Sequence, residues 1–352
     1  MHNQEEAKIN IFSRILLMIH MFRCIHSVST FQAGAFQGSS ANHLHLVHRC
    51  FHCTSQLNLN RFLFDVSEIM VEGDSEVSIG GDRDCSAAVP TVILPTDDYR
   101  TVHAAKTLGL HSGDTLRAGV VDGGITDSAT VQWMADGKDA PTKSGKPPGP
   151  LKISLRNLSD AEAAFTEESK VSLMLALPRP LALSRILPMI AQMGVDELIL
   201  TTAQKVPKDY FGSHLFRKPE ELRRHLVEGL CQAGDVRLPK ITVVRRLKPF
   251  LEDELDEKFP REAVARVIAH PLRKDVSQAL PLRFRDVVFP DESNKKVLVA
   301  VGPEGGWAED YELDLFIKEH SFQQITLGAR TLRSDVAVVS LLGLAQDACI
   351  SK

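Results

Sequence analysis

The segment Gly302-Pro-Glu-Gly-Gly306 directly follows the apolar run Val297-Leu-Val-Ala-Val301. In α/β proteins, ligands bind where a buried strand of the sheet ends in a loop. Glycine residues in such a loop let backbone amides approach the ligand closely. Pro303 stiffens the loop, and Glu304 places one carboxylate beside it. This arrangement predicts a ligand-binding loop at the carboxyl end of a strand.

A second segment able to bind a ligand, Leu327-Gly-Ala-Arg-Thr-Leu-Arg333, lies between an expected strand and the last expected helix. Three charged residues lie in or just after this segment: Arg330, Arg333 and Asp335. The sequence contains neither the G-x-G-x-x-G pattern of dinucleotide-binding folds nor the G-x-x-x-x-G-K-[ST] pattern of P-loops. A nucleotide-phosphate site at the glycine loop is also disfavoured, since no lysine follows Gly306.

Together the two segments resemble the closing signature of the ribosomal RNA small-subunit methyltransferase E family. Val267-Ile-Ala-His-Pro271 resembles the family's strand and His-Pro loop, and Met193-Gly-Val195 resembles the end of its first domain helix. Gln232-Ala-Gly234 and Arg237-Leu-Pro239 resemble its Gln-Ser-Gly region. Asn60-Arg-Phe-Leu-Phe64 and Gly113-Asp114 resemble its small N-terminal domain. The resemblance covers roughly residues 58–352 and is strongest from residue 264 onward.

The resemblance implies an α/β fold in which a small PUA-like β-barrel domain precedes a parallel-sheet domain of the SPOUT type with a trefoil knot. It implies methylation of uridine N3 in small-subunit rRNA, with S-adenosylmethionine as the methyl donor. Two subunits would together form the active site, so a homodimer is expected, and the partner is the small ribosomal subunit. The sulfonium of the donor is already activated, so no metal is expected.

The resemblance also implies which residues hold the cofactor, mostly through backbone amides and carbonyls. They lie in three loops and are Ala269, His270, Pro271, Gly302, Pro303, Glu304, Gly305, Gly306, Leu327, Gly328, Arg330 and Leu332.

Catalysis is expected from three side chains of the same region. Arg333 is the candidate for orienting the uracil or stabilising its anion, and Asp335 or Glu304 could accept a proton. Two structural alternatives stand beside these roles. Arg330 and Arg333 could form a salt bridge with Asp335 or Glu304, and Glu304 could only brace its loop by accepting backbone hydrogen bonds.

RNA binding is expected from Arg61, Arg223, Arg224 and Arg333. The net charge is −4; residues 1–64 carry 5 basic and 2 acidic residues, which leaves 36 basic and 43 acidic residues, a net of −7, for the rest. A general electrostatic attraction for nucleic acid is therefore not expected, and RNA binding requires a local basic surface. Arg217-Lys218 and the segment 245–248 are further basic groups, although each could be an ordinary solvated surface.

Several positions depart from the family pattern. Gln192 stands where a carboxylate is usual, Ala233 and Asp235 replace Ser and Arg, and Val336 lies in an altered closing motif. An alternative function follows from these changes: a non-catalytic or differently targeted RNA-binding ribosome assembly factor that retains the knotted fold. Binding of S-adenosylmethionine without methyl transfer to RNA would favour it.

The elements that must position these loops divide the chain after residue 57. Residues 58–158 read as β-rich, with a helix over 97–108 and a Gly/Pro/Lys-rich hairpin loop over 135–150. A connection follows at 159–170. Strands then alternate with helices over 171–352, which indicates a mostly parallel sheet. Pro219 and Gly234 should begin and end one helix, and Ser334 should cap a last, buried helix that runs to residue 348.

Residues 1–57 differ in composition from the rest. No acidic residue occurs from Ala7 to Phe64, and 7 of the 13 histidines lie within the first 52 residues. This pattern is typical of an organellar transit peptide, mitochondrial or chloroplast; a cytoplasmic protein is expected if the segment is not one. His45, His48, Cys50, His52 and Cys53 are spaced like zinc ligands, but no second pair lies nearby. No apolar run is long enough to span a membrane, so no membrane association is expected.

Overall fold

The structure is a computed structural model of the 352-residue chain. It describes residues 61–71, 89–135, 137–159, 169–271 and 281–350, all of which belong to one compact unit that spans residues 58–352. The expected transit peptide, the zinc-like cluster and most of the 159–170 connection lie outside the described residues. Among the described helices, none has the length and apolar character needed to cross a membrane.

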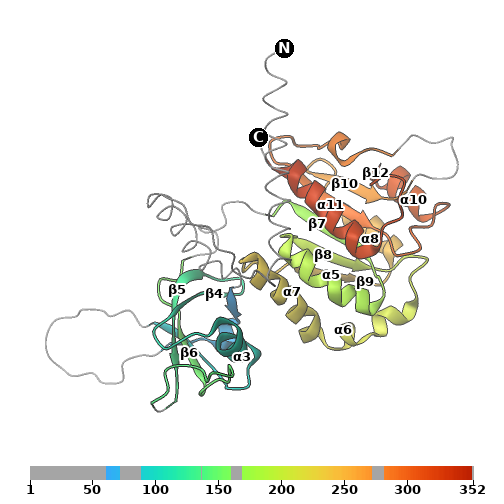
Figure 1. Ribbon diagram of the computed structural model, residues 1–352. Coiled ribbons are helices and arrows are strands. Elements are labelled where there is room, and N and C mark those ends of the chain that lie inside the picture. Colours follow the sequence, from blue (N-terminus) through green and yellow to red (C-terminus); the bar gives the residue numbers. More distant parts are fainter. Residues whose placement is uncertain (1–60, 72–88, 136, 160–168, 272–280, 351–352) are drawn as a thin grey trace, which may run out of the picture. The chain divides into compact units, whose positions relative to one another are not determined.

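The first part of the described chain forms a six-stranded sheet in the order β1-β4-β5-β6-β3-β2 (Figure 1). Its strands are β1 (Phe62–Phe64), β2 (Met70–Val71), β3 (Pro90–Leu94), β4 (Thr115–Val120), β5 (Ile125–Trp133) and β6 (Leu151–Ser154). Only β1 and β4 run parallel. Its own buried core includes Phe64, Trp133 and Ile153. The antiparallel pair of β5 and β6 confirms the expected hairpin around the 135–150 loop.

The second part forms a six-stranded sheet, entirely parallel, in the order β12-β10-β11-β7-β8-β9. Its strands are β7 (Val171–Ala176), β8 (Glu197–Thr201), β9 (Lys240–Val244), β10 (Val264–Ala269), β11 (Lys296–Val301) and β12 (Gln323–Ile325). Every residue of β7 and β8 is buried. Buried strands that are mostly apolar along their whole length are what a sheet covered on both faces requires, and they confirm the expected parallel α/β domain.

Helices connect these strands. They are α5 (Pro180–Gln192), α6 (His214–Arg217), α7 (Pro219–Ala233), α8 (Leu247–Asp253), α9 (Leu255–Lys258), α10 (Glu312–Asp314) and α11 (Ser334–Cys349), and the first sheet carries α3 (Tyr99–His103). Helix α11 packs against β11, β7 and α5, and α5 packs against α7 (Figure 1). Gly229 of α7 allows that last contact, since a Cβ there would lie 2.1 Å from the carbonyl oxygen of Pro188.

The expected helix ends at Pro219 and Gly234 are confirmed, with Gly234 in the left-handed conformation at φ 75°. Two expectations were wrong. Ser334 does not cap α11, because the helix already includes it and Arg333 occupies the cap position. Helix α10 begins at Glu312, whose carboxylate accepts the backbone N–H of Ala308.

The last of these wrong expectations concerns burial of α11. Its apolar side chains are not covered all round, because Val336 is 49% exposed and Leu344 is 42% exposed.

Candidate functional site

A cavity of about 350 Å³ lies at the carboxyl ends of β10, β11 and β12. It is lined by three loops: residues 269–271 after β10, residues 301–306 after β11 and residues 325–332 after β12. All the residues that the sequence assigned to the cofactor lie among the lining residues. The cavity is also lined by Lys205, Glu309, Thr326, Thr331, Ser334, Ala337 and Leu341.

Strand register explains why these three loops meet. Ala269 pairs with Val301 in the β10–β11 ladder and with Ile325 in the β10–β12 ladder. The three strands therefore end at one level, because the carboxyl ends of parallel strands meet at the same edge of a sheet. The next residue on each strand, such as Gly302 after Val301, begins a loop at the cavity.

Glycine is required at three places in these loops. Gly306 has φ 68° and Gly328 has φ 107°, in the region that side chains with a Cβ rarely adopt. A Cβ on Gly302 would lie 3.1 Å from the indole ring of Trp307, which is fully buried. The loop over 302–306 thus folds tightly onto Trp307 and turns its backbone toward the cavity.

Two charged side chains that the sequence reasoning missed hold the glycine loop in place. Lys205 Nζ donates to the carbonyl oxygens of Gly305 at 2.8 Å and Trp307 at 3.4 Å. The buried carboxylate of Glu312 accepts the backbone N–H of Gln204 at 2.6 Å and that of Ala308 at 2.9 Å. The loop after β8 is thereby fastened to the loop after β11. No motif marks either residue, because their partners are backbone groups, most of them about 100 residues away in sequence.

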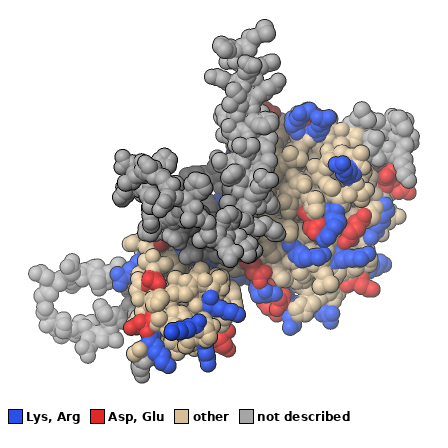
Figure 2. All heavy atoms as spheres, viewed as in Figure 1, with Lys and Arg blue, Asp and Glu red and all other residues tan. Residues whose placement is uncertain are grey.

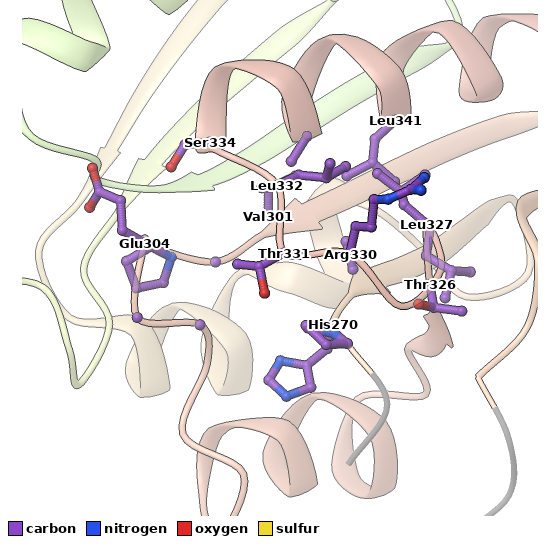
Figure 3. A pocket seen from close by; sticks show the side chains of 18 of the residues that line it. His270, Val301, Glu304, Thr326, Leu327, Arg330, Thr331, Leu332, Ser334 and Leu341 are labelled. Carbon is purple, nitrogen blue, oxygen red and sulfur yellow. The ribbon is translucent and has the colours of Figure 1, made fainter. Parts of the chain in front are cut away.

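Glu304 lines the cavity, but its Oε1 accepts the backbone N–H of Arg179, at the cap position of α5, with a distance of 3.3 Å. A carboxylate is stabilised at a helix N-terminus. This contact supports the structural alternative for Glu304, which is to brace its loop. In Figure 3, Glu304 lies at one end of the labelled group, and Leu327 and Thr326 lie at the other. Thr331 and Arg330 lie between them, and His270 lies below. His270 Nε2 lies 3.4 Å from Glu309 Oε1.

Arg333 and Asp335 do not line the cavity. Arg333 donates to Asp335 at 2.7 Å, and its side chain is 69% exposed. The salt-bridge alternative therefore holds for Arg333. Asp335 instead lines a second hollow beside α11, together with Met189, Gln192, Met193, Val336, Val339 and Ser340. Leu332 and Ser334, the sequence neighbours of Arg333, both line the cavity, so Arg333 lies at its rim.

The expected RNA-binding role of Arg61 is wrong on physical grounds. Its side chain is 2% exposed and donates to the carbonyl oxygens of Gly234, Ala118 and Thr126 and to the carboxylate of Asp127. Burial lowers the pKa of its guanidinium, and the ion pair with Asp127 opposes that change. Arg61 joins the first sheet to the end of α7 and has no surface to offer a ligand.

Arg223 and Arg224 are exposed to different degrees, yet both are neutralised locally. Arg223 pairs with Asp65, and Arg224 pairs with Glu221 and Glu228 on its own helix. In the view of Figure 2, Lys and Arg side chains alternate with Asp and Glu over the coloured surface. Such exposed pairs contribute little stability, but they reduce the positive potential that RNA phosphates would feel.

The contact between the two loops makes a testable prediction at Glu312. Glu312→Ala would leave the N–H groups of Gln204 and Ala308 without their acceptor, at a cost of about 1–3 kcal/mol each. We expect faster amide exchange in residues 203–206 and 303–309, measured by hydrogen–deuterium exchange mass spectrometry, with little change in the β sheets. Asp310→Ala, at a neighbouring exposed carboxylate, is the control. Equal protection in the two variants would contradict the role given to Glu312.

Comparison with known proteins agrees with this geometry. Residues 166–346 match the model of the RNA methyltransferase domain. Ribosomal RNA small subunit methyltransferase E of Treponema pallidum is 24% identical over 249 residues, which cover 70% of this chain and 81% of that protein. Ribosomal RNA small subunit methyltransferase E 1 of Borreliella burgdorferi is 25% identical over 171 residues, 49% of this chain and 64% of that protein.

Solved structures share the fold at low sequence identity. Ribosomal RNA small subunit methyltransferase E of Neisseria gonorrhoeae, bound to S-adenosylmethionine, has a TM-score of 0.51 and 18% identity over 82% of this chain and 97% of that one. A probable rRNA methyltransferase of Porphyromonas gingivalis has a TM-score of 0.52 and 19% identity over 72% of this chain and 93% of that one. The family match extends over more than half of the chain and includes every loop of the cavity. The chain therefore belongs to the RNA methyltransferase domain family, and within it resembles ribosomal RNA small-subunit methyltransferase E.

Proposed function

We propose that this protein is an S-adenosylmethionine-dependent methyltransferase of RNA. The observation that carries the proposal is the cavity at the register-matched ends of β10, β11 and β12, which lies within the family match. The relative from Neisseria gonorrhoeae and a methyltransferase from Legionella pneumophila, with a TM-score of 0.50, were both solved with this cofactor.

The lining of the cavity fits the cofactor in size and chemistry. A volume of about 350 Å³ is within the usual range for small-molecule sites, which are mostly apolar with a few placed polar groups. Val301, Leu327, Leu332 and Leu341 offer apolar contacts for a flat base, and the glycine loop offers backbone groups. The carboxylates of Glu304 and Glu309 suit a ligand with a sulfonium and an ammonium group.

The chain's own residues would act mainly by positioning. When bound, S-adenosylmethionine supplies a methyl group on a sulfonium, which needs no further activation. The loops held by Lys205 and Glu312 fix the direction of transfer, and correct orientation alone removes much of such a barrier. The exposed Arg333, paired with Asp335, can approach the acceptor base from the rim. Asp335 can then take a proton that the base loses.

We propose uridine N3 of small-subunit rRNA as the acceptor, because the curated relatives are small-subunit rRNA methyltransferases and the closing loop keeps Leu332 and Arg333. The finer features of the fold, a trefoil knot in the parallel-sheet domain and a PUA-like first domain, are part of the same proposal. Tracing the chain in an experimental structure would test both.

We also propose a homodimer through α5 and α11. Their outer surface exposes Met189, Val336 and Leu344 at 37%, 49% and 42% and borders the hollow that contains Asp335. Contiguous exposed apolar side chains mark interaction sites on soluble proteins, and a second subunit there would bring its surface to Arg333 and Asp335. Sedimentation equilibrium tests this proposal, since Val336→Asp should give monomers.

The positions at which this sequence departs from the family pattern give little support to the alternative of a non-catalytic assembly factor. Asp235 is part of the local structure, because it accepts the N–H groups of Val236 and Arg237 and pairs with the Arg237 side chain at 3.0 Å. Its exchange for the family's Arg is therefore compatible with an intact fold. Gln192 and Val336 lie together at the hollow beside α11, away from the cofactor loops.

The glycine loop is tested by Gly305→Val. A branched side chain there would meet Lys205, whose Cδ lies 3.1 Å from the Cβ position, and would occupy the wall of the cavity. We expect at least a tenfold loss of S-adenosylmethionine affinity by calorimetry, about 1.4 kcal/mol or more, with an unchanged circular dichroism spectrum. Gly212→Val, at an exposed position with open space around it, should bind as the unaltered protein does. Unchanged S-adenosylmethionine affinity in Gly305→Val would contradict the assignment of this loop to the cofactor site.

The acceptor is tested in cells that lack this protein. Mass spectrometry of organellar and cytoplasmic small-subunit rRNA should reveal loss of one 3-methyluridine. Purified protein and S-adenosylmethionine should restore it on the unmodified rRNA in vitro. An unchanged modification profile in both rRNA pools would remove uridine N3 as the proposed acceptor, and cofactor binding without any transfer would favour the assembly factor.

A further inference from the structure

We propose that basic side chains leaving the carboxyl ends of β7, β8 and β9 form the surface that binds the RNA backbone beside the cavity. This inference rests on the proposed function and deepens it, since it says where the substrate is held. It replaces Arg61, Arg223 and Arg224, which are buried or paired with carboxylates.

The sheet places these side chains on the edge that carries the cavity. Val301 of β11 pairs with Leu175 of β7, and Ala176 of β7 pairs with Thr201 of β8. Thr201 in turn pairs with Val244 of β9. The segments 177–185, 202–218 and 245–248 therefore leave the sheet from the edge at which the Gly302 loop begins, and they continue the row of loops away from the cavity.

The charge of these three segments is strongly one-sided. They contain one acidic residue, Asp209, and nine basic residues, in a chain whose net charge is −4. The basic residues are Arg179, Arg185, Lys205, Lys208, Arg217, Lys218, Arg245, Arg246 and Lys248. Lys205 is used within the protein, by the glycine loop, and Lys248 pairs with Glu252 at 3.4 Å. The other seven are available for a ligand.

Six of these seven lie in loops or at the ends of short elements: Arg179, Lys208, Arg217, Lys218, Arg245 and Arg246. All six are exposed. The seventh, Arg185, lies within α5. Within the described ranges, no carboxylate lies within 4.0 Å of any of the six. The exposed Arg224 of α7, by contrast, pairs with two carboxylates of its own helix. Cations that are grouped at one edge and not paired with carboxylates create a local positive potential, which attracts a negatively charged partner.

Aromatic packing holds part of this surface in shape. The guanidinium of Arg245 lies 5.2 Å from the ring centroid of Phe211, and Phe211 packs against Phe216 with centroids 5.4 Å apart. Lys208 lies in the same short 3₁₀ helix as Phe211, and Arg217 follows Phe216 directly. The backbone N–H of Thr202 donates to the Val244 carbonyl at 3.2 Å, which ties the starts of the second and third segments together.

This chemistry suits the phosphates of RNA. Arginine offers a planar fork of donors that matches phosphate oxygens, and lysine offers a point charge. Contacts of this kind position a nucleic acid without reading its sequence. A strand held along the row would lead toward the cavity, so one nucleotide could reach its rim, next to the bound cofactor, while the neighbouring nucleotides stay bound to Lys208, Arg245 and Arg246.

The test compares two variants that each lose three positive charges. Lys208→Ala/Arg245→Ala/Arg246→Ala removes three of the six exposed cations of the proposed surface. Lys240→Ala/Lys295→Ala/Lys318→Ala is the control, because these three lysines pair with carboxylates at 4.0, 3.0 and 2.8 Å. Binding of a fluorescein-labelled small-subunit rRNA transcript is measured by anisotropy over a range of salt concentrations.

We expect the first variant to bind the transcript at least ~10-fold more weakly at physiological salt, and the slope of log affinity against log salt to fall by about 2 for the lost phosphate contacts. The control should stay within about twofold of the unaltered protein by the same electrostatic reasoning. Both variants should keep the S-adenosylmethionine affinity of the unaltered protein.

Equal RNA affinity and salt slope in the two variants would overturn this inference and leave the proposed methyltransferase function standing. Failure of the unaltered protein to bind the transcript at all would overturn both the inference and the rRNA substrate.

Discussion

The parallel register of β10, β11 and β12 is the constraint on which the candidate site depends. Ala269, Val301 and Ile325 are paired across two ladders, so three segments distant in sequence reach the cavity at the same height. A shift of one residue in either ladder would turn every side chain of a strand to the opposite face of the sheet. Five of the six residues of β10 and five of the six residues of β11 are buried, so a shift between these two strands would disturb the core, and the position of their loops follows from core packing.

Register alone would leave the glycine loop free to move. Its fixation comes from charged groups that bond to backbone rather than to each other. Glu312 is buried and accepts two N–H groups, and Lys205 donates to two carbonyl oxygens. Hydrogen bonds with a charged partner are stronger than neutral ones, and those of the buried Glu312 carboxylate are screened less by water. The loop is therefore shaped before a ligand arrives, which reduces the ordering cost of binding.

The distribution of charge separates structural from functional cations. Arg61 and Arg266 are buried and donate to backbone carbonyls and one carboxylate each, so they hold elements together. Among the described residues, the six exposed cations named above at the ends of β7, β8 and β9 have no carboxylate partner, whereas Lys248 of the same segments pairs with Glu252 and Lys205 donates to backbone carbonyls. Overall acidity is then compatible with RNA binding, because a polyanion responds to the local surface that it approaches.

The sequence by itself determined the strands of the parallel sheet, the helix ends at Pro219 and Gly234, and the glycine loop after β11, and its resemblance to a known family pointed to all three loops that line the cavity. These features are local: buried strands are apolar runs, helix ends have their own preferred residues, and a glycine loop after a strand is visible as a motif. Only the tertiary structure decided the roles of single charged side chains. Arg61 is buried although arginine is usually exposed, and Arg333 is paired with Asp335. Lys205 acts on a loop about 100 residues away in sequence, and Glu312 acts on groups 4 and 108 residues away. The sequence shows which residues are charged, but the fold decides which group each of them contacts. The distances that decide an ion pair or a hydrogen bond arise only when distant segments pack together.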